Sequence, residues 1–315
     1  MNDARTLTER LKARALELGF QKVGVARAGS ADPEGRLRAW LAKGGHAGMG
    51  YMAEGVAERE DATVLLPGAK SVVALMISYA PEAPEPVLAE ARVARYARSD
   101  DYHGFLKRRV RKLRKFLIQL VPDAKVHPAL DTSPVLERAW AARAGIAWIG
   151  KSTMAISRDL GTYTFLAALV TTAELEADPP HDDYCGSCTR CLTACPTQAF
   201  VAPRVLDARR CITYWTVEHV GGVPAGSPDP HGWLAGCDIC QEVCPWNKFA
   251  QPTREPRLKP HPELTTPDLS MFADEASEER RRQVLDGTAL QRTGSASLRR
   301  NALRILEERS RPPRS

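Results

Sequence analysis

The sequence predicts an α/β domain, followed by a cysteine-rich module and a short helical C-terminal part. Three observations predict this order. Segments with helix and strand periodicity alternate over residues 1–175, all eight cysteines lie between Cys185 and Cys244, and helical periodicity returns after the last of them. The predicted domains are residues 1–175, 176–255 and 256–315.

Composition limits the class of protein. A chain of 315 residues with 43% hydrophobic content is large enough for two or three domains with their own cores. No apolar run approaches the ~18–20 residues that span a bilayer, and the first ten residues are too polar for a secretory signal. We therefore expect a cytoplasmic protein with no membrane segment, present as a monomer.

The elements of the first domain follow from apolar spacing and turn residues. Helices are expected over residues 7–18, from residue 33 to the glycines at 44 and 45, over a basic stretch after residue 101, and over 135–144. Strands are expected over residues 22–26, 71–79, 125–130 and 163–172, the second and fourth as buried apolar runs. Beyond residue 256, helices are expected over 275–285 and 297–308, resembling one or two HEAT-like repeats.

Positive charge is concentrated in two segments. Seven of the nine residues 107–115 are basic, and residues 280–315 contain ten arginines against three acids. Clustered cations release counterions on meeting a polyphosphate, which makes a nucleic acid a reasonable partner. The alternative, that both segments are solvated helix faces, stays open on composition alone.

The cysteines have the spacing of the bacterial ferredoxin motif. The first run reads Cys185-x₂-Cys188-x₂-Cys191-x₃-Cys195-Pro196. In that motif the fourth cysteine ligates the other cluster. The crossed pattern predicts one 4Fe-4S cluster on Cys185, Cys188, Cys191 and Cys244. It predicts the other cluster on Cys195, Cys211, Cys237 and Cys240. Two structural zinc sites, or a disulfide framework, are the alternatives.

Residues 145–153 end in Gly150-Lys151-Ser152-Thr153, which has the ending of a phosphate loop. The two glycines at 145 and 150 satisfy the spacing, but a helix rather than a strand precedes them. ATP binding is therefore less favoured than another phosphate-bearing ligand.

Five segments together resemble the epoxyqueuosine reductase family: residues 101–109, 130–153, 185–200, 206–219 and 236–249. The resemblance extends from about Leu7 to Arg304. It implies an α/β cobalamin-binding domain similar to that of reductive dehalogenases, a two-cluster bacterial ferredoxin-like module and a helical C-terminal part. It also implies reduction of epoxyqueuosine to queuosine in a tRNA anticodon loop, the last step of queuosine biosynthesis. An external low-potential donor would pass electrons through the clusters to cobalamin. The chain is shorter at its end than some members, which leaves the size of the helical tRNA-binding part open.

The same resemblance implies catalytic residues. Asp131 matches the proposed proton donor, and we expect burial against a corrin to raise its pKa. Tyr102 and His103 match other polar positions of the site. The alternatives are that Asp131 only caps a helix and that His103 is a surface residue. The Asp-x-His-x-x-Gly signature of a lower axial histidine is incomplete, because Leu106 replaces its glycine, so we expect base-off cobalamin without His103 as a ligand.

Contacts to the cofactor and to tRNA are assigned from the same motifs. The candidates for cobalamin are Arg138, Lys151, Ser152, Thr153, Thr213 and Asp238. The candidates for the tRNA backbone are Arg108, Arg109 and Arg111, which we expect to be exposed on the basic helix.

Two competing functions remain at this stage. One is a cobalamin oxidoreductase similar to reductive dehalogenases that acts on a small molecule, although such proteins usually need an export signal. The other is a non-catalytic electron-transfer ferredoxin fused to an α/β domain. Retention of cobalamin by the reconstituted protein would separate the second from the reductase.

Overall fold

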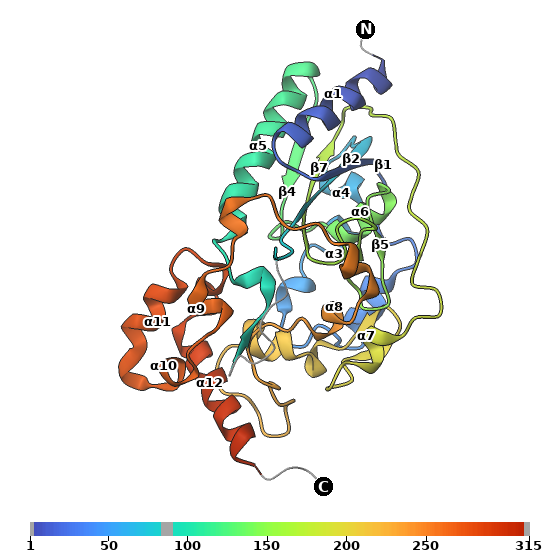
Figure 1. Cartoon of the computed structure of the whole chain (residues 1–315). Helices are drawn as coiled ribbons and strands as arrows, with labels where there is room; N and C mark the ends of the chain where they lie inside the picture. Colours follow the sequence, from blue (N-terminus) through green and yellow to red (C-terminus); the bar gives the residue numbers. More distant parts are fainter. Residues whose placement is uncertain (1–2, 83–90, 312–315) are drawn as a thin grey trace.

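The structure is a computed structural model that describes residues 3–82 and 91–311. A sheet with its helices lies at the end of the molecule that carries the N-terminus, and the C-terminal helices lie at the opposite end (Figure 1). The cysteine-rich segment, coloured yellow to light orange, lies below the sheet in this view. Among the described residues, no helix has the length and apolar character needed to cross a membrane.

The sheet is antiparallel and joins its strands in the order β1-β2-β7-β4. Their bounds are Lys22–Arg27 (β1), Ser71–Ser78 (β2), Val126–Ala129 (β4) and Thr164–Thr171 (β7). In the register of the central strands, Leu75 lies opposite Val23 on one side and Ala167 on the other. The expected strands are confirmed, with no end shifted by more than one residue.

The central strand β2 is buried on both faces, which explains its unbroken apolar run. Successive side chains of a strand point to opposite faces. One set, including Val73, packs with α1 (Ala4–Glu17) and α5 (Tyr102–Leu120). The other set, including Met76, packs against α6 (Glu137–Arg143). The sheet is therefore the middle layer between two layers of helices.

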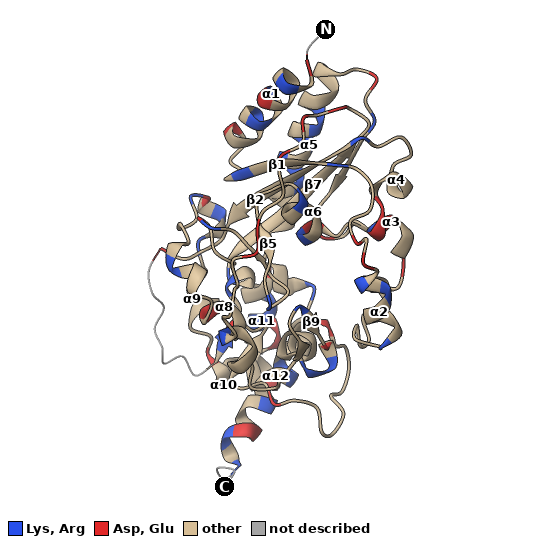
Figure 2. Cartoon of the chain, turned by 90° about the vertical axis from the view of Figure 1, so that its right-hand side faces the viewer, with Lys and Arg blue, Asp and Glu red and all other residues tan. Residues whose placement is uncertain are grey.

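The basic helix predicted after residue 101 is α5. Asp101 caps its N-terminus by accepting a hydrogen bond of 3.0 Å from the backbone N–H of His103. The buried stripe consists of Leu106, Val110, Leu113 and Leu117. Lysine and arginine recur along the rest of the helix (Figure 2). The expectation that all arginines of this helix are exposed is wrong. The guanidinium of Arg109 turns inward to the buried carboxylate of Glu255.

Smaller elements complete the first domain. They are α2 (Arg36–Ala42), η1 (Gly50–Met52), α3 (Val56–Glu60), α4 (Ala62–Leu65), η2 (Arg95–Ala97) and a hairpin of β5 (Trp148–Ile149) and β6 (Ala155–Ile156). The helices expected from residues 33 and 135 begin later, at Arg36 and Glu137. The segment proposed as a phosphate loop is the turn of this hairpin, in which Gly150 N–H donates to Met154 O. No helix follows it, so the ATP interpretation is wrong.

The cysteine-rich module is built from single turns and short strands. Its elements are α7 (Arg190–Thr193), β8 (Phe200–Ala202), β9 (Val205–Leu206), η3 (Ala208–Arg210), the π-helical η4 (Tyr214–Glu218), β10 (Trp233–Ala235), α8 (Ile239–Glu242) and η5 (Pro245–Phe249). The turns α7 and α8 each follow closely spaced cysteines and contact one another. They bring the two cysteine runs together.

The C-terminal part contains helices, as predicted. They are η6 (Pro256–Leu258), α9 (Pro262–Thr265), α10 (Leu269–Ala273), η7 (Glu275–Ser277), α11 (Glu278–Leu285), η8 (Ala289–Gln291) and α12 (Ser295–Ser310). Their apolar core also includes β3 (Arg92–Val93), which pairs in parallel with β10. A segment assigned to the first domain thus packs with the third, while the exact boundaries and the HEAT-like character stay predictions.

Several arginines of the C-terminal tail stabilise the fold from within. Arg281 is only 2% exposed and donates a hydrogen bond of 3.0 Å to the hydroxyl of Ser295. Arg300 donates hydrogen bonds to the backbone oxygens of Trp215 and His219, both at 3.0 Å. These guanidinium groups satisfy carbonyl and hydroxyl oxygens of the chain itself. The number of arginines in the tail therefore overstates the charge that a polyphosphate would meet.

Candidate active site

Asp131 lies on a tight turn just beyond the end of β4. Its φ of 53° is in the left-handed region that few residues other than glycine adopt. Its backbone N–H donates a hydrogen bond of 2.6 Å to Oε1 of Glu137, and its side chain is half exposed. Unfavourable backbone conformations of this kind concentrate at functional sites. The turn presents the carboxylate of Asp131 outward while Glu137 holds its backbone.

The three residues predicted to be catalytic come together in space. Nε2 of His103 lies 3.0 Å from Oδ2 of Asp131, and Nδ1 of His103 lies 2.6 Å from Oδ1 of Asp101. The ring of Tyr102 stacks on those of His103 and Phe165, with centroids 4.0 Å and 3.9 Å away. The first turn of α5 therefore places an imidazole between two carboxylates. Neither alternative holds, since α6 is capped at another residue and the His103 side chain is mostly buried.

The carboxylates of Asp101 and Asp131 raise the pKa of His103. Burial alone would lower the pKa of His103, but hydrogen bonds to Asp131 and Asp101 outweigh it and raise the pKa. The hydrogen bond from His103 lowers the pKa of Asp131 by more than burial raises it. The expectation that a corrin raises the pKa of Asp131 stays a prediction, and the hydrogen bond from His103 acts in the opposite direction. His103 therefore keeps its proton to a higher pH than a free imidazole does, and Asp131 is the carboxylate that contacts its Nε2.

Glu137 is a functional candidate that the sequence analysis missed. Besides accepting the hydrogen bond from Asp131, it has a pKa raised by burial to about 7. An acidic group with such a pKa beside a predicted catalytic residue is a common property of functional sites. The only available signal was its position six residues after Asp131, which by itself predicts no contact.

A second missed group surrounds Glu218. The hydroxyl of Tyr51 lies 3.4 Å from Oε2 of Glu218, and a guanidinium nitrogen of Arg292 lies 2.9 Å from Oε1. The positive charge of Arg292 also contributes to the lowered pKa of Asp131. These side chains come from η1, η4 and the segment before α12. Glycines on both sides of Met49 were a weak sequence signal for a functional role of the neighbouring Tyr51. The sequence contained no signal for Arg292.

The eight cysteines form two groups. All are free thiols, so the disulfide alternative is wrong. Burial raises the pKa of Cys244 to about 11, and the thiols that raise it further are those of Cys185, Cys191 and Cys188. Burial also raises the pKa of Cys237, and the nearby thiols of Cys240 and Cys211 raise it further. The thiol of Cys195 in turn raises the pKa of Cys211. This grouping agrees with the crossed assignment.

The sequence left two kinds of inorganic group open for the eight thiols, 4Fe-4S clusters and zinc ions. Within residues 3–82 and 91–311, no three His, Cys, Asp or Glu side chains converge as a single metal ion would require. Zinc holds its sulfur ligands at about 2.3 Å, which draws them close together. A cube of irons and sulfides spreads four thiolates around a wider body. Eight thiolates complete two clusters of four ligands each, with no thiol left over.

The residues predicted to contact cobalamin lie in two parts of the structure. Lys151 donates hydrogen bonds to the backbone oxygens of Gly186 and Cys188, at 2.6 Å and 3.0 Å. It thus holds the first cysteine loop. Ser152, next to it, is buried.

The other candidates lie nearer to the Asp131 turn or to the second cysteine group. A guanidinium nitrogen of Arg138 donates to the backbone oxygen of Thr153 at 3.1 Å. Thr213 hydrogen-bonds the thiol of Cys211 and so opposes the rise of its pKa. Asp238 has no exposed surface and accepts a hydrogen bond of 2.8 Å from the backbone N–H of Arg95. The carboxylate of Asp238 is thus engaged within the chain, and its contact with the corrin stays a prediction.

The arginines predicted to contact tRNA differ in their exposure. Arg108 and Arg111 are exposed on α5. Arg109 is mostly buried by its ion pair with Glu255. Only two of these three arginines are available to a phosphate backbone.

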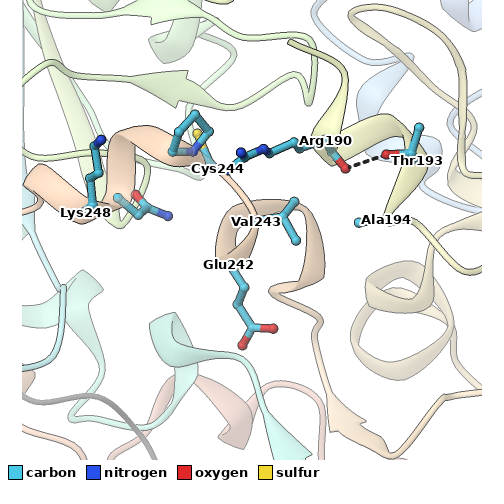
Figure 3. A pocket seen from close by; sticks show the side chains of 9 residues that line it. Arg190, Thr193, Ala194, Glu242, Val243, Cys244 and Lys248 are labelled. Atoms are coloured by element: carbon cyan, nitrogen blue, oxygen red, sulfur yellow. Dashed lines mark hydrogen bonds between the residues drawn. The ribbon is translucent and has the colours of Figure 1, made fainter.

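A pocket of about 930 Å³ opens beside Cys244, between α7 and the turn that follows α8 (Figure 3). Arg190 and Lys248 line it, together with Val243. The side chain of Glu242 points away from both cations, toward the guanidinium of Arg95 at 3.0 Å. The pocket therefore brings the positive side chains of Arg190 and Lys248, and part of Glu242, close to Cys244, a predicted cluster ligand.

Two known families match parts of the chain. Residues 184–247 match the 4Fe-4S double cluster binding domain, a range that includes all eight cysteines. Residues 59–132 match the family described as epoxyqueuosine reductase QueG, DUF1730. The second range contains Tyr102, His103 and Asp131. Both halves of the candidate site thus lie in recognised families.

Full-length relatives agree. The epoxyqueuosine reductase of Gloeobacter violaceus is 39% identical over 303 residues, covering 93% of each chain. A crystal structure of epoxyqueuosine reductase with an epoxyqueuosine-modified tRNA-Tyr stem loop has a TM-score of 0.86 at 30% identity, covering 96% of this chain and 82% of that one. An epoxyqueuosine reductase from Bacillus subtilis, its catalytic loop swung out of the active site, has a TM-score of 0.84 at 30% identity and the same coverage. This chain belongs to the epoxyqueuosine reductase family.

Proposed function

We propose that this chain reduces the epoxide of epoxyqueuosine in a tRNA anticodon loop to the alkene of queuosine, the last step of queuosine biosynthesis. The observation that carries the proposal is the contact of His103 with Asp131 in a chain that also has a double cluster domain. Relatives that match nearly the whole chain are named for this activity, and one was crystallised with an epoxyqueuosine-modified stem loop.

The reaction needs both electrons and protons. Removing an epoxide oxygen as water takes up two electrons and two protons and leaves an alkene. The oxygen departs as a strongly basic alkoxide, so a positioned acid accelerates bond cleavage. His103 holds a proton because Asp101 and Asp131 raise its pKa. Asp131, on its half-exposed turn, receives that proton and delivers it to the departing oxygen.

Residues around this pair would position the modified nucleotide. Tyr51 and Arg292 are both held by Glu218, and Arg292 influences the carboxyl of Asp131. A guanidinium at the entrance to the site suits the phosphates that flank the modified base. The aromatic ring of Tyr51, 46% exposed, suits stacking on an unpaired base. These two side chains would hold the substrate over Asp131.

The electrons would enter through the clusters and reach the substrate at a base-off cobalamin, as the sequence resemblance implies. Bound cobalamin supplies low-potential chemistry that protein side chains lack. The structure supports one part of this assignment, because both ring nitrogens of His103 are engaged by carboxylates and neither is free to ligate cobalt. Arg138, Thr153 and Thr213 would contact the cofactor, while Lys151 would secure the cluster loop.

The tRNA backbone would contact the exposed face of α5. Arg108 and Arg111 lie there, in the same helix that carries His103 at its first turn. A phosphate backbone that follows this helix would therefore lead toward the catalytic pair. The competing functions explain less, since an electron-transfer ferredoxin has no use for the strained turn at Asp131.

One experiment tests the proposal directly. The protein with both clusters is incubated without oxygen with cobalamin, dithionite and tRNA that carries epoxyqueuosine, and the nucleosides are analysed by mass spectrometry. We expect loss of one oxygen from the modified nucleoside. Cobalamin retained by the protein without any conversion of the nucleoside would contradict the proposed reaction.

A further inference from the structure

We propose that the surface beside Cys244 binds an acidic one-electron carrier protein, which reduces the first cluster. The inference rests on the proposed function insofar as a reductase needs an external donor. We define the donor surface as Arg158, Tyr184, Arg190, Trp246, Lys248 and Phe249. Its position, its exposed rings and its charge each support this assignment.

The donor surface lies directly against the first cysteine group. Tyr184 precedes Cys185 in the chain, and Trp246 follows Cys244 by two residues. The pocket lined by Arg190 and Lys248 also contains Cys244 in its wall. Electron transfer weakens steeply with distance between redox centres. A carrier bound here would therefore come as close to the first cluster as the protein surface allows.

The second cysteine group is linked along the chain to residues near the catalytic pair. Cys211 begins the segment that leads through η4 to Glu218, the partner of Tyr51 and Arg292. The two groups adjoin, since α7, which contains Cys191, packs against α8, which contains Cys240. Electrons that enter at the donor surface would thus pass from the first cluster to the second and on toward the site.

Exposed aromatic rings form a continuous strip across the donor surface. Phe249 is 52% exposed and Tyr184 is 38% exposed. Trp246 connects them, with ring centroids 5.8 Å from Phe249 and 5.9 Å from Tyr184. Aromatic residues are enriched in protein interfaces and supply much of their binding free energy. A strip of this kind beside a redox centre suits a protein partner.

The charge of the donor surface identifies the kind of protein. The ammonium of Lys248 lies 4.8 Å from the ring centroid of Phe249, and the guanidinium of Arg158 lies 5.3 Å from that of Tyr184. Across residues 3–82 and 91–311, no carboxylate forms an ion pair with either cation or with Arg190.

Most acidic groups nearby are neutralised within the chain, whereas Asp182 is exposed and forms no ion pair with the described residues. Glu242 pairs with Arg92 and Arg95, and Asp183 pairs with Arg204. The donor surface is therefore positive around an aromatic centre. Complementary charge speeds the encounter of two proteins. The partner should present carboxylates around its own redox centre, and each encounter would oxidise it by one electron and reduce one cluster by one.

The test uses the protein with both clusters and flavodoxin hydroquinone, an acidic one-electron donor. Mixing in a stopped-flow instrument without oxygen gives blue flavin semiquinone as each flavodoxin loses one electron. The double variant R190E/K248E should lower the second-order rate constant at low salt by about tenfold or more, and added salt should slow the unsubstituted protein. R190Q/K248Q should give an intermediate rate. K115E, on the distant end of α5, is the matched control and should leave the rate unchanged.

Three results would overturn the proposal. The first is that the unsubstituted protein produces no flavin semiquinone. The second is that R190E/K248E and K115E oxidise flavodoxin at equal rates. The third is that R190E/K248E loses as much rate when dithionite replaces flavodoxin as the donor. A fall in tRNA affinity in R190E/K248E, without a change in the flavodoxin rate, would reassign the surface to nucleic acid. The test contains no tRNA, so its outcome is independent of whether epoxyqueuosine is the substrate.

Discussion

Nε2 of His103 lies 3.0 Å from Oδ2 of Asp131, while Nδ1 of the same ring lies 2.6 Å from Oδ1 of Asp101. Asp101 also caps α5, so the imidazole is fixed on the side of the helix. On the other side its partner sits on a turn in the left-handed region. Proton transfer to a substrate therefore depends on the position of this turn, since the ring itself is held in place.

Replacing the carboxylate at this contact should stop the reaction. Asp131→Asn keeps the size of the side chain but cannot carry a proton, so we expect turnover to fall by about 10²–10⁴-fold. Single-turnover formation of queuosine in tRNA measures this, with iron content as a check on the clusters. Asp123→Asn, an exposed aspartate of the same domain, is the control. Unchanged turnover in Asp131→Asn would remove this residue from the mechanism.

The raised pKa of His103 predicts a pH dependence of activity and of stability. Turnover should fall as pH rises through this pKa, because only the imidazolium donates a proton. A pKa raised in the folded state stabilises the protein fully below the unfolded value of about 6.5, and this contribution is lost as pH rises through the folded value.

The measurement is the free energy of unfolding by urea for the native sequence and for His103→Gln. Their difference should shrink as pH increases from about 6 to about 9. A difference that stays constant over this range would show that the two carboxylates do not raise the pKa of His103.

Glu137 should act as a positioning residue for the Asp131 turn. Glu137→Ala removes the acceptor of the 2.6 Å hydrogen bond from the Asp131 N–H, and we expect about a tenfold loss of turnover. Glu137→Gln keeps an oxygen acceptor and should restore most of it. The native sequence should also show an inflection of turnover near the pKa of about 7 that Glu137→Gln lacks. Equal activities for the Ala and Gln variants would argue against positioning.

The arginines of α5 should separate into two kinds. Arg108→Ala with Arg111→Ala should weaken tRNA binding and reduce the slope of log K against log salt by about two. Arg109→Ala should leave that slope unchanged, because its guanidinium pairs with Glu255. It should instead lower the free energy of unfolding by on the order of 1.5–3 kcal/mol. A slope altered by Arg109→Ala alone would show that this residue faces the tRNA.

The crossed ligand assignment predicts which cysteines share a cluster. Cys185→Ser and Cys244→Ser should lose the same cluster, and Cys237→Ser should lose the other, with iron falling from about eight to about four atoms per chain in each case. Electron paramagnetic resonance of the reduced proteins distinguishes the two signals. If Cys244→Ser and Cys237→Ser lose the same signal, the crossed assignment fails.

Local features of this protein were predictable from its sequence. The strand Ser71–Ser78 and the helix Tyr102–Leu120 follow from the spacing of apolar residues, which depends only on neighbours in the chain. The cysteine spacing likewise predicts a double cluster domain, because three ligands of one cluster come from seven consecutive residues. Family membership followed because several such local motifs occur together.

The tertiary structure decided which partner each polar side chain meets. Arg109 was expected to face solvent, but it pairs with Glu255, 146 residues further along the chain. Lys151 turns to the cysteine loop, and the contact between His103 and Asp131 raises the pKa of the first and lowers that of the second. Such outcomes depend on burial and on charges brought close by packing of distant segments. The sequence by itself determined the elements and the double cluster domain. The packing of α5 against the sheet and the C-terminal segments determined the partners of its polar side chains and the directions of their pKa shifts.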